Sequence, residues 1–192
     1  PVLMETEVTP ELVKKEKPDV VFAATGAEPI IPNIPGADRP NVVTAHDVLS
    51  GKVNTGNSVV VVGGGCVGAE TANQLANYLK GVTIIEMLDA IAGDEIVVPR
   101  WDLLEDLDRN KVRICTKTTV DEITDAGVKV SGAVNEVIPC DTVVLAVGAK
   151  PVLGLADALK KEGYDVRVIG DAAKVGLGGE AIMEGFEVGR TI

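Results

Sequence analysis

A glycine-rich turn between an apolar run and a predicted helix constrains this chain more than any other feature. Residues 59–86 begin with four valines, continue through GGGCVG and end in a second apolar run, VTIIE. Gly63, Gly65 and Gly68 have the GxGxxG spacing of a dinucleotide-binding turn. The first glycine allows a tight turn out of the strand, the second lets the backbone approach a pyrophosphate, and the third lets the helix pack closely on the sheet. The segment therefore predicts a strand, helix and strand that bind a dinucleotide.

The two ends of this segment indicate which dinucleotide it binds. The phosphates are expected at the N-terminus of a helix over residues 67–80, where unpaired N–H groups and the helix dipole favour an anion. Glu86 ends the second strand, where a carboxylate can accept hydrogen bonds from the adenine ribose and repel a 2′-phosphate. Residues 87–90 contain no Arg or Lys, so the sequence favours NADH over NADPH. A purely structural glycine turn is the alternative. The candidate cofactor-binding residues of this segment are Gly63, Gly64, Gly65, Cys66, Val67, Gly68 and Glu86.

Charge and hydropathy exclude several classes of partner. The net charge of -11 argues against nucleic acid, because binding to it depends on Lys and Arg neutralising phosphates, and against an anionic membrane surface. No apolar run approaches the roughly 18 to 20 residues of a membrane span, and the first residues, PVLMETEV, lack the basic and apolar regions of a signal peptide. A cytoplasmic location is the expectation.

The residues that usually carry metal or redox chemistry are few and dispersed. Cys66, Cys115 and Cys140 are far apart and form no CxxC pair, and His46 is the only histidine. We expect the cysteines to be buried as small apolar residues, and we predict no metal site and no local redox disulfide. No paired acid and base, tyrosine proton donor or cysteine nucleophile can be proposed, so the chain offers no catalytic residue.

The pattern along the chain predicts an α/β fold with an insertion. Strands are expected over residues 1–8, 19–24, 59–62, 82–86, 141–148 and 164–169, helices over 10–17, 67–80, 100–109, 153–162 and 179–192, and a short strand and helix within 41–51. Thr9 and Pro10 are typical of the N-cap and first turn of a helix. Alternating residues between 112 and 140 indicate short antiparallel strands.

We therefore expect a Rossmann-like parallel sheet with helices on both faces and an inserted small antiparallel meander. The nucleotide-binding unit is predicted over 55–148. The pieces 1–54 and 149–192 resemble neither each other nor complete domains, which suggests that they are two parts of one larger α/β domain interrupted by the nucleotide-binding unit.

Five motifs in order connect the chain to a known family. They are ATGAEPIIPNIPG at 24–36, NVVTAHDVLSGK at 41–52, VVVVGGGCVGAETA at 59–72, VLAVGAKP at 144–151 and VRVIGDAAKVG at 166–176. With these motifs the chain resembles the flavoprotein reductases that have two dinucleotide-binding domains. Within them it is most similar to the C-terminal part of the NADH:flavin oxidoreductases of the 2,4-dienoyl-CoA reductase and trimethylamine dehydrogenase group. The resemblance covers almost the entire chain, and it implies that the flanking pieces form an incomplete FAD-type domain.

The resemblance also implies roles for residues outside the glycine turn. Thr25 and Gly26 match the turn where the FAD domain meets the NADH domain, and Gly148 belongs to its counterpart on the return path. Asp171 matches the carboxylate that hydrogen-bonds the flavin ribityl chain. Glu70 matches a glutamate near the nicotinamide, and a carboxylate that merely stabilises the helix N-terminus is an equal alternative.

Members of this subgroup contain parts that this sequence does not. They begin with a flavin-binding (β/α)8 barrel, continue through cysteines that ligate an iron–sulfur cluster, and carry a first GxGxxG that clamps FAD. The resemblance therefore implies FMN and the iron–sulfur cluster in segments outside this sequence, with only part of the FAD contacts here. The implied function is that of an NADH-binding domain which positions NADH for hydride transfer to a flavin.

Three alternatives stay open at this point. The chain could be a non-catalytic dinucleotide-binding or electron-transfer partner subunit. A disulfide reductase would need a redox-active cysteine pair, which the sequence lacks. Finally, the fold could bind nothing usefully because its FAD-type domain is incomplete.

Overall fold

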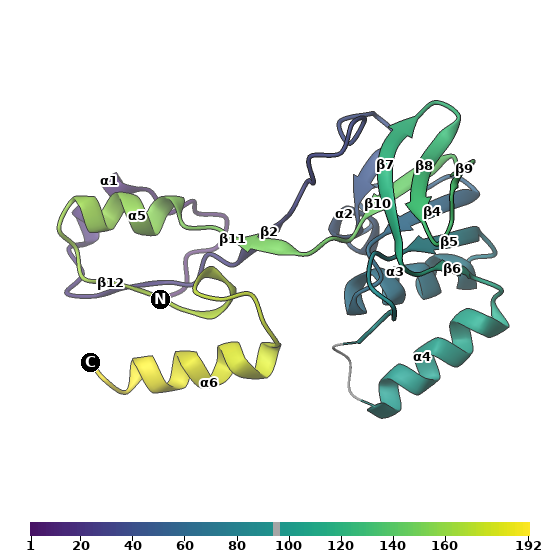
Figure 1. Ribbon diagram of the computed structural model, residues 1–192. Helices are drawn as coiled ribbons and strands as arrows, with labels where there is room; N and C mark the ends of the chain where they lie inside the picture. The colour runs from purple at the N-terminus through teal and green to yellow at the C-terminus, as the bar shows by residue number, and fades with distance from the viewer. Residues whose placement is uncertain (94–96) are drawn as a thin grey trace. The chain divides into compact units, whose positions relative to one another are not determined.

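The computed structural model describes residues 1–93 and 97–192, which form two compact units (Figure 1). The larger unit is Pro29–Gly148, and the smaller one combines Pro1–Glu28 with Ala149–Ile192. The larger unit begins well before residue 55, where the sequence placed its start. The reason is that strand β3 (Val42–Thr44) pairs with β10 (Thr142–Leu145), which draws the preceding segment into the same unit.

The larger unit is built on a five-stranded sheet in which every neighbouring pair is parallel. The order β3-β10-β4-β5-β6 places the valine-rich β4 at its centre. Such a strand, buried on both faces, is typical of a parallel sheet. The predicted α/β class is confirmed. The remaining strands of the sheet are β4 (Ser58–Val62), β5 (Gly81–Ile85) and β6 (Arg113–Cys115).

The two faces of this sheet have different covers. Successive side chains of a strand point to opposite faces, so Val59 and Val61 contact one layer while Val60 and Val62 contact the other. The first layer consists of helices α2 (Ala45–Leu49), α3 (Cys66–Asn77) and α4 (Val97–Arg109). The second is an antiparallel meander of β7 (Thr118–Thr124), β8 (Gly127–Gly132) and β9 (Glu136–Ile138), which occupies the face where we expected further helices.

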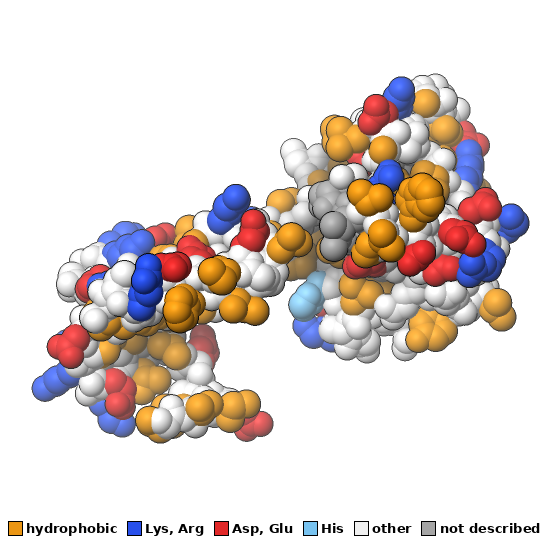
Figure 2. All heavy atoms as spheres, turned by 90° about the horizontal axis from the view of Figure 1, so that it is seen from below, with side chains coloured by type: hydrophobic (Ala, Val, Ile, Leu, Met, Phe, Trp, Pro, Cys, Tyr) orange, Lys and Arg blue, Asp and Glu red, His pale blue; other side chains and the backbone are white. Residues whose placement is uncertain are grey.

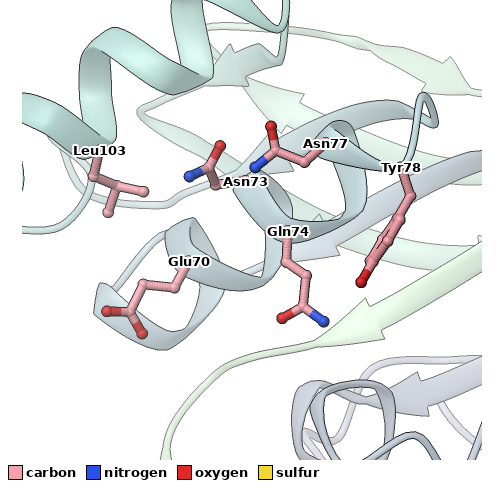
Figure 3. Close-up of a pocket in the computed structure, with 6 residues that line it drawn as sticks. All are labelled: Glu70, Asn73, Gln74, Asn77, Tyr78 and Leu103. Carbon is pink, nitrogen blue, oxygen red and sulfur yellow. The ribbon is translucent and has the colours of Figure 1, made fainter.

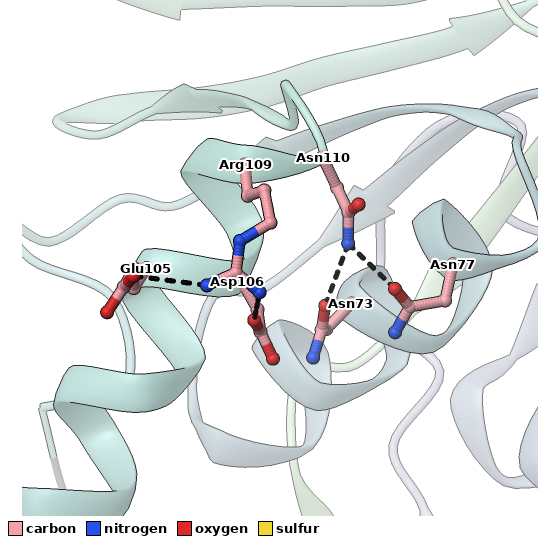
Figure 4. A network of polar contacts seen from close by, with 6 residues as sticks. All are labelled: Asn73, Asn77, Glu105, Asp106, Arg109 and Asn110. Atoms are coloured by element: carbon pink, nitrogen blue, oxygen red, sulfur yellow. Dashed lines mark hydrogen bonds and ion pairs between the residues drawn. The ribbon is translucent and has the colours of Figure 1, made fainter.

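Helices α3 and α4 lie side by side and are joined by an amide cluster (Figure 4). The side-chain amide of Asn110 donates to the Oδ1 atoms of Asn73 at 3.4 Å and Asn77 at 2.9 Å. Beneath the polar contacts, Leu107 of α4 is fully buried in the helical layer. These contacts fix α4 against the helix that follows the glycine turn.

The smaller unit contains little sheet. β1 (Val21–Ala23) pairs in parallel with β12 (Val166–Val168), and β2 (Ala27–Pro29) pairs with β11 (Ala149–Pro151), each as a two-stranded sheet within the described residues. Residues 1–8 do not form the predicted strand; their apolar side chains are exposed. The helices of this unit are α1 (Pro10–Glu16), α5 (Gly154–Lys161) and α6 (Gly178–Gly189), with a 3-10 turn at Gly170–Ala172.

The helices of the smaller unit differ in how well they are packed. Thr9 accepts a hydrogen bond from the backbone N–H of Leu12 at 3.4 Å, which confirms the predicted N-cap of α1. Helix α5 buries Ala156 and Leu159, whereas α6 buries no side chain. The exposed side chains of α6 include Ile182, Met183 and Phe186. Figure 2 shows one face of the molecule, on which hydrophobic side chains are exposed among acidic and basic ones.

Candidate nucleotide-binding site

The glycine turn between β4 and α3 accepts only glycine at its first and last motif positions. Gly63 has a φ of +100°, which disfavours any side chain, and a Cβ there would overlap the carbonyl oxygen of Ala146. A Cβ at Gly68 would overlap the carbonyl oxygen of Gly63. The turn is also tied to the neighbouring strand, because the Gly63 N–H donates to the carbonyl of Ile85 at 2.8 Å. These two glycines are thus required by the fold itself.

Gly65 differs, because the space above it is open. A Cβ at this position would meet no atom within 4 Å, and its φ of -62° is available to any residue. Gly65 is also the N-cap of α3 and provides no side chain to cap the helix, and the first turn of α3 has no acidic residue. The helix N-terminus therefore presents backbone N–H groups to an accessible space, which is the environment that favours a phosphate.

Glu86 at the end of β5 is held by backbone donors on two sides. Its side chain is buried, with 8% of its surface exposed. Oε2 accepts a hydrogen bond from the Gly64 N–H at 2.6 Å, and Oε1 accepts one from the Leu88 N–H at 2.8 Å. Each carboxylate oxygen retains acceptor capacity beyond this one bond. The carboxylate is thus fixed beside the glycine turn and can still accept hydrogen bonds from hydroxyl groups of a ligand.

The segment after Glu86 is folded against the turn by several contacts. The Ala92 N–H donates to the carbonyl of Gly64 at 2.7 Å, and the buried Ile91 side chain lies where a Cβ at Gly64 would be. Arg100 of α4 donates from Nε to the carbonyl of Ala92 at 2.8 Å and from Nη2 to that of Ile91 at 3.0 Å. No motif in the sequence indicates this role of Arg100.

The remaining predicted residues lie elsewhere. Thr25 and Gly26 are in the smaller unit, where the Thr25 hydroxyl donates to the carbonyl of Val152 at 2.5 Å. Gly148, with a φ of +97°, ends the larger unit. Asp171 lies in the 3-10 turn of the smaller unit, and its Oδ1 accepts from the Gly176 N–H at 3.2 Å. The glycine turn, Glu70, Glu86 and Gly148 therefore lie in the larger unit, and a hydrogen bond from Gly64 to Glu86 joins the turn to that carboxylate.

Glu70 is exposed on α3, in the row of residues that lines a shallow surface hollow of about 360 Å³ (Figure 3). The other lining residues of α3 are mainly amides, and Leu103 comes from α4. A second hollow, of about 280 Å³, includes Asp171 and lies beside Glu184, whose Oε2 accepts from the Gly170 N–H at 2.6 Å. Each hollow contains one predicted residue.

The cysteines are partly or fully buried and form no disulfide. Burial raises the pKa of the Cys115 thiol, and burial together with the neighbouring Asp141 carboxylate raises that of Cys140. Within residues 1–93 and 97–192, no group of His, Cys, Asp and Glu side chains could hold a metal ion. The helices of the same ranges include none that is long and apolar enough to cross a membrane.

Most of the chain, including the segment that forms this turn, matches a known protein family. The family model described as pyridine nucleotide-disulphide oxidoreductase matches residues 5–173. The chain belongs to this family. It is a Rossmann-type nucleotide-binding domain of the type found in flavoprotein oxidoreductases.

Three known proteins illustrate the relationship. An NADH oxidase of Thermoanaerobacter brockii is 42% identical over 93% of this chain and 28% of its own length. A bilirubin reductase of Mediterraneibacter gnavus (strain CC55_001C) is 41% identical over 84% of this chain and 25% of its own. The solved complex of 2-naphthoyl-CoA reductase with 2-naphthoyl-CoA is 35% identical, with a TM-score of 0.91 over 97% of this chain and 29% of that one. The chain thus spans less than a third of the length of each.

Proposed function

We propose that this chain is the NADH-binding part of a larger flavin-dependent oxidoreductase and that it positions NADH for hydride transfer to a flavin. The observation that carries this proposal is the open space above Gly65, at the N-terminus of α3, which has no side-chain cap, beside a carboxylate, that of Glu86, which is hydrogen-bonded to the same turn. A relative described as an NADH oxidase supports the choice of NADH. The greater length of the relatives supports a larger parent enzyme.

Each part of the turn has a role in this proposal. The backbone from Gly63 to Gly68, which includes Cys66 and Val67, would hold the pyrophosphate through N–H groups and the helix dipole. Glu86 would accept hydrogen bonds from the adenine ribose, and its negative charge would repel the extra phosphate of NADPH. The nicotinamide supplies the hydride when NADH is bound, so this chain contributes binding and orientation.

The remaining assignments extend the proposal to the parent enzyme. We assign the enzyme to the 2,4-dienoyl-CoA reductase and trimethylamine dehydrogenase group, a choice that the similarity to 2-naphthoyl-CoA reductase supports. Glu70 would lie near the nicotinamide, Thr25, Gly26 and Gly148 at the passage between domains, and Asp171 at the flavin ribityl chain. FMN, an iron–sulfur cluster and the main FAD clamp would belong to other segments. The cytoplasmic location stays a prediction.

A calorimetric titration of the 192-residue chain with NADH and with NADPH tests the central part of this proposal. We expect saturable binding of NADH at micromolar concentration and weaker binding of NADPH, because we place the adenine ribose beside the buried carboxylate of Glu86. Absence of NADH binding to the folded chain would refute the proposal. Tighter binding of NADPH would refute the role of Glu86 while leaving dinucleotide binding in place.

A further inference from the structure

The guanidinium of Arg100 holds the loop that closes over the glycine turn. Its two hydrogen bonds, from Nε and Nη2, go to the consecutive backbone carbonyls of Ala92 and Ile91. A planar fork with parallel donors suits two adjacent acceptors, and the compact ammonium of lysine does not reproduce it. Arg100 comes from α4, which the amide cluster of Asn110 fixes against α3. The loop is thus held from a helix that is itself anchored.

The loop of residues 87–92 is connected to the predicted ribose site through two backbone hydrogen bonds of Gly64. Gly64 accepts a hydrogen bond from the Ala92 N–H at 2.7 Å through its carbonyl, and it donates its own N–H to Glu86 Oε2 at 2.6 Å. The Ile91 side chain occupies the space that a Cβ of the same glycine would take. At the other end of the loop, the Leu88 N–H holds the second oxygen of Glu86. The position of this carboxylate therefore depends on the conformation of residues 87–92.

We propose that Arg100 is a positioning residue which sets the preference for NADH over NADPH by holding residues 87–92 and, through them, the carboxylate of Glu86. This inference rests on the proposed function. Arg100 acts through the Ile91 and Ala92 carbonyls. Its loss lets the loop move away from Gly64 and leaves Glu86 less well placed to bind the ribose hydroxyls and to exclude a 2′-phosphate.

The test compares two arginines of the same helix. Arg100→Met keeps most of the apolar stem and removes the fork. Arg109→Met is the matched control, because Arg109 pairs with Glu105 and Asp106 of α4 itself (Figure 4). Dissociation constants for NADH and NADPH are measured by calorimetry on both variants and on the unsubstituted chain, with thermal unfolding recorded for each.

We expect Arg100→Met to weaken NADH binding about tenfold and NADPH binding much less, so that the ratio of the two constants falls about fivefold or more. Arg109→Met should change neither constant by more than about twofold. An unchanged ratio in Arg100→Met, including an equal loss for both dinucleotides, would overturn the inference. If the unsubstituted chain fails to bind NADH, the proposed function fails first, and the two failures are therefore distinguishable.

Amide hydrogen exchange of Arg100→Lys provides a second measurement that does not depend on the dinucleotide. This milder variant retains the charge and loses the fork. We expect the Ala92 amide, which donates to Gly64, to exchange about tenfold faster than in the unsubstituted chain, while amides in the centre of β4 are unchanged. Unaltered protection at Ala92 would show that the loop is held without the fork and would overturn the inference.

Discussion

Replacement of Gly65 by alanine separates the binding role of the glycine turn from its role in the fold. The added Cβ meets no atom within 4 Å, and the φ of -62° is an ordinary value for alanine. Gly→Ala substitutions at such positions change the free energy of unfolding by less than about 1 kcal/mol, usually in the stabilising direction. The methyl group nevertheless occupies the space at the N-terminus of α3 where we place the pyrophosphate.

The expected cost in affinity follows from the bonds that the methyl group displaces. A hydrogen bond to a charged group is worth about 1.5–3 kcal/mol, so the loss of one raises the dissociation constant for NADH roughly 10-fold to 150-fold. Calorimetric titration measures this loss, and urea denaturation checks that the fold is retained. Gly154→Ala is the control, because a Cβ at Gly154 also meets no atom within 4 Å and it lies at the start of α5 in the smaller unit. Equal NADH affinity in Gly65→Ala and Gly154→Ala would refute the placement of the pyrophosphate.

Three further predictions concern the fold, the ribose site and pH. Gly68→Ala should lower the free energy of unfolding by about 1–3 kcal/mol, measured by urea denaturation, because the Cβ of the new alanine overlaps the Gly63 carbonyl oxygen. A smaller loss would contradict the close approach of α3 to the glycine turn. Glu86→Gln removes the charge that we expect to repel the 2′-phosphate of NADPH. The ratio of the dissociation constants for NADPH and NADH, measured by calorimetry, should therefore fall about fivefold or more. An unchanged ratio would show that the carboxylate does not select the cofactor. Burial raises the pKa of the Cys115 and Cys140 thiols, so the folded state favours their protonated form. Their contribution to the free energy of unfolding is therefore complete below the ordinary thiol pKa of about 8.5, and it is lost as pH rises through their folded-state pKa. Between about pH 8 and pH 10, where thiols titrate, the free energy of unfolding should therefore decline as pH rises. The decline should be shallower when Cys115 and Cys140 are both replaced by alanine. Identical slopes in the two proteins would contradict this prediction.

The sequence predicted well those features that depend on neighbouring residues. The glycine spacing placed the turn between β4 and α3, because Gly63 and Gly68 meet constraints within the turn itself: a positive φ at Gly63 and the close approach of Gly68 to the Gly63 carbonyl. Thr9 marked the start of α1 for the same reason, since its side chain bonds the helix that follows it directly. The apolar run VTIIE predicted Glu86 at the end of a strand, and the structure places it directly after β5.

Features that depend on distant pairing were missed. The larger unit reaches back to Pro29 and contains β3, which pairs with β10 far along the chain, and residues 42–44 alone do not reveal that partner. The meander was expected, but alternation does not reveal which sheet face it covers. Arg100 acts on backbone carbonyls, which carry no sequence signature, so its role became visible only in the folded chain.

A crystal structure of the chain soaked with NADH tests the proposed binding site most directly. We predict the pyrophosphate over Gly65 at the N-terminus of α3 and the adenine ribose hydroxyls within hydrogen-bond distance of the Glu86 carboxylate. NADH bound elsewhere on the chain, with the space above Gly65 unoccupied at saturating NADH, would contradict this placement.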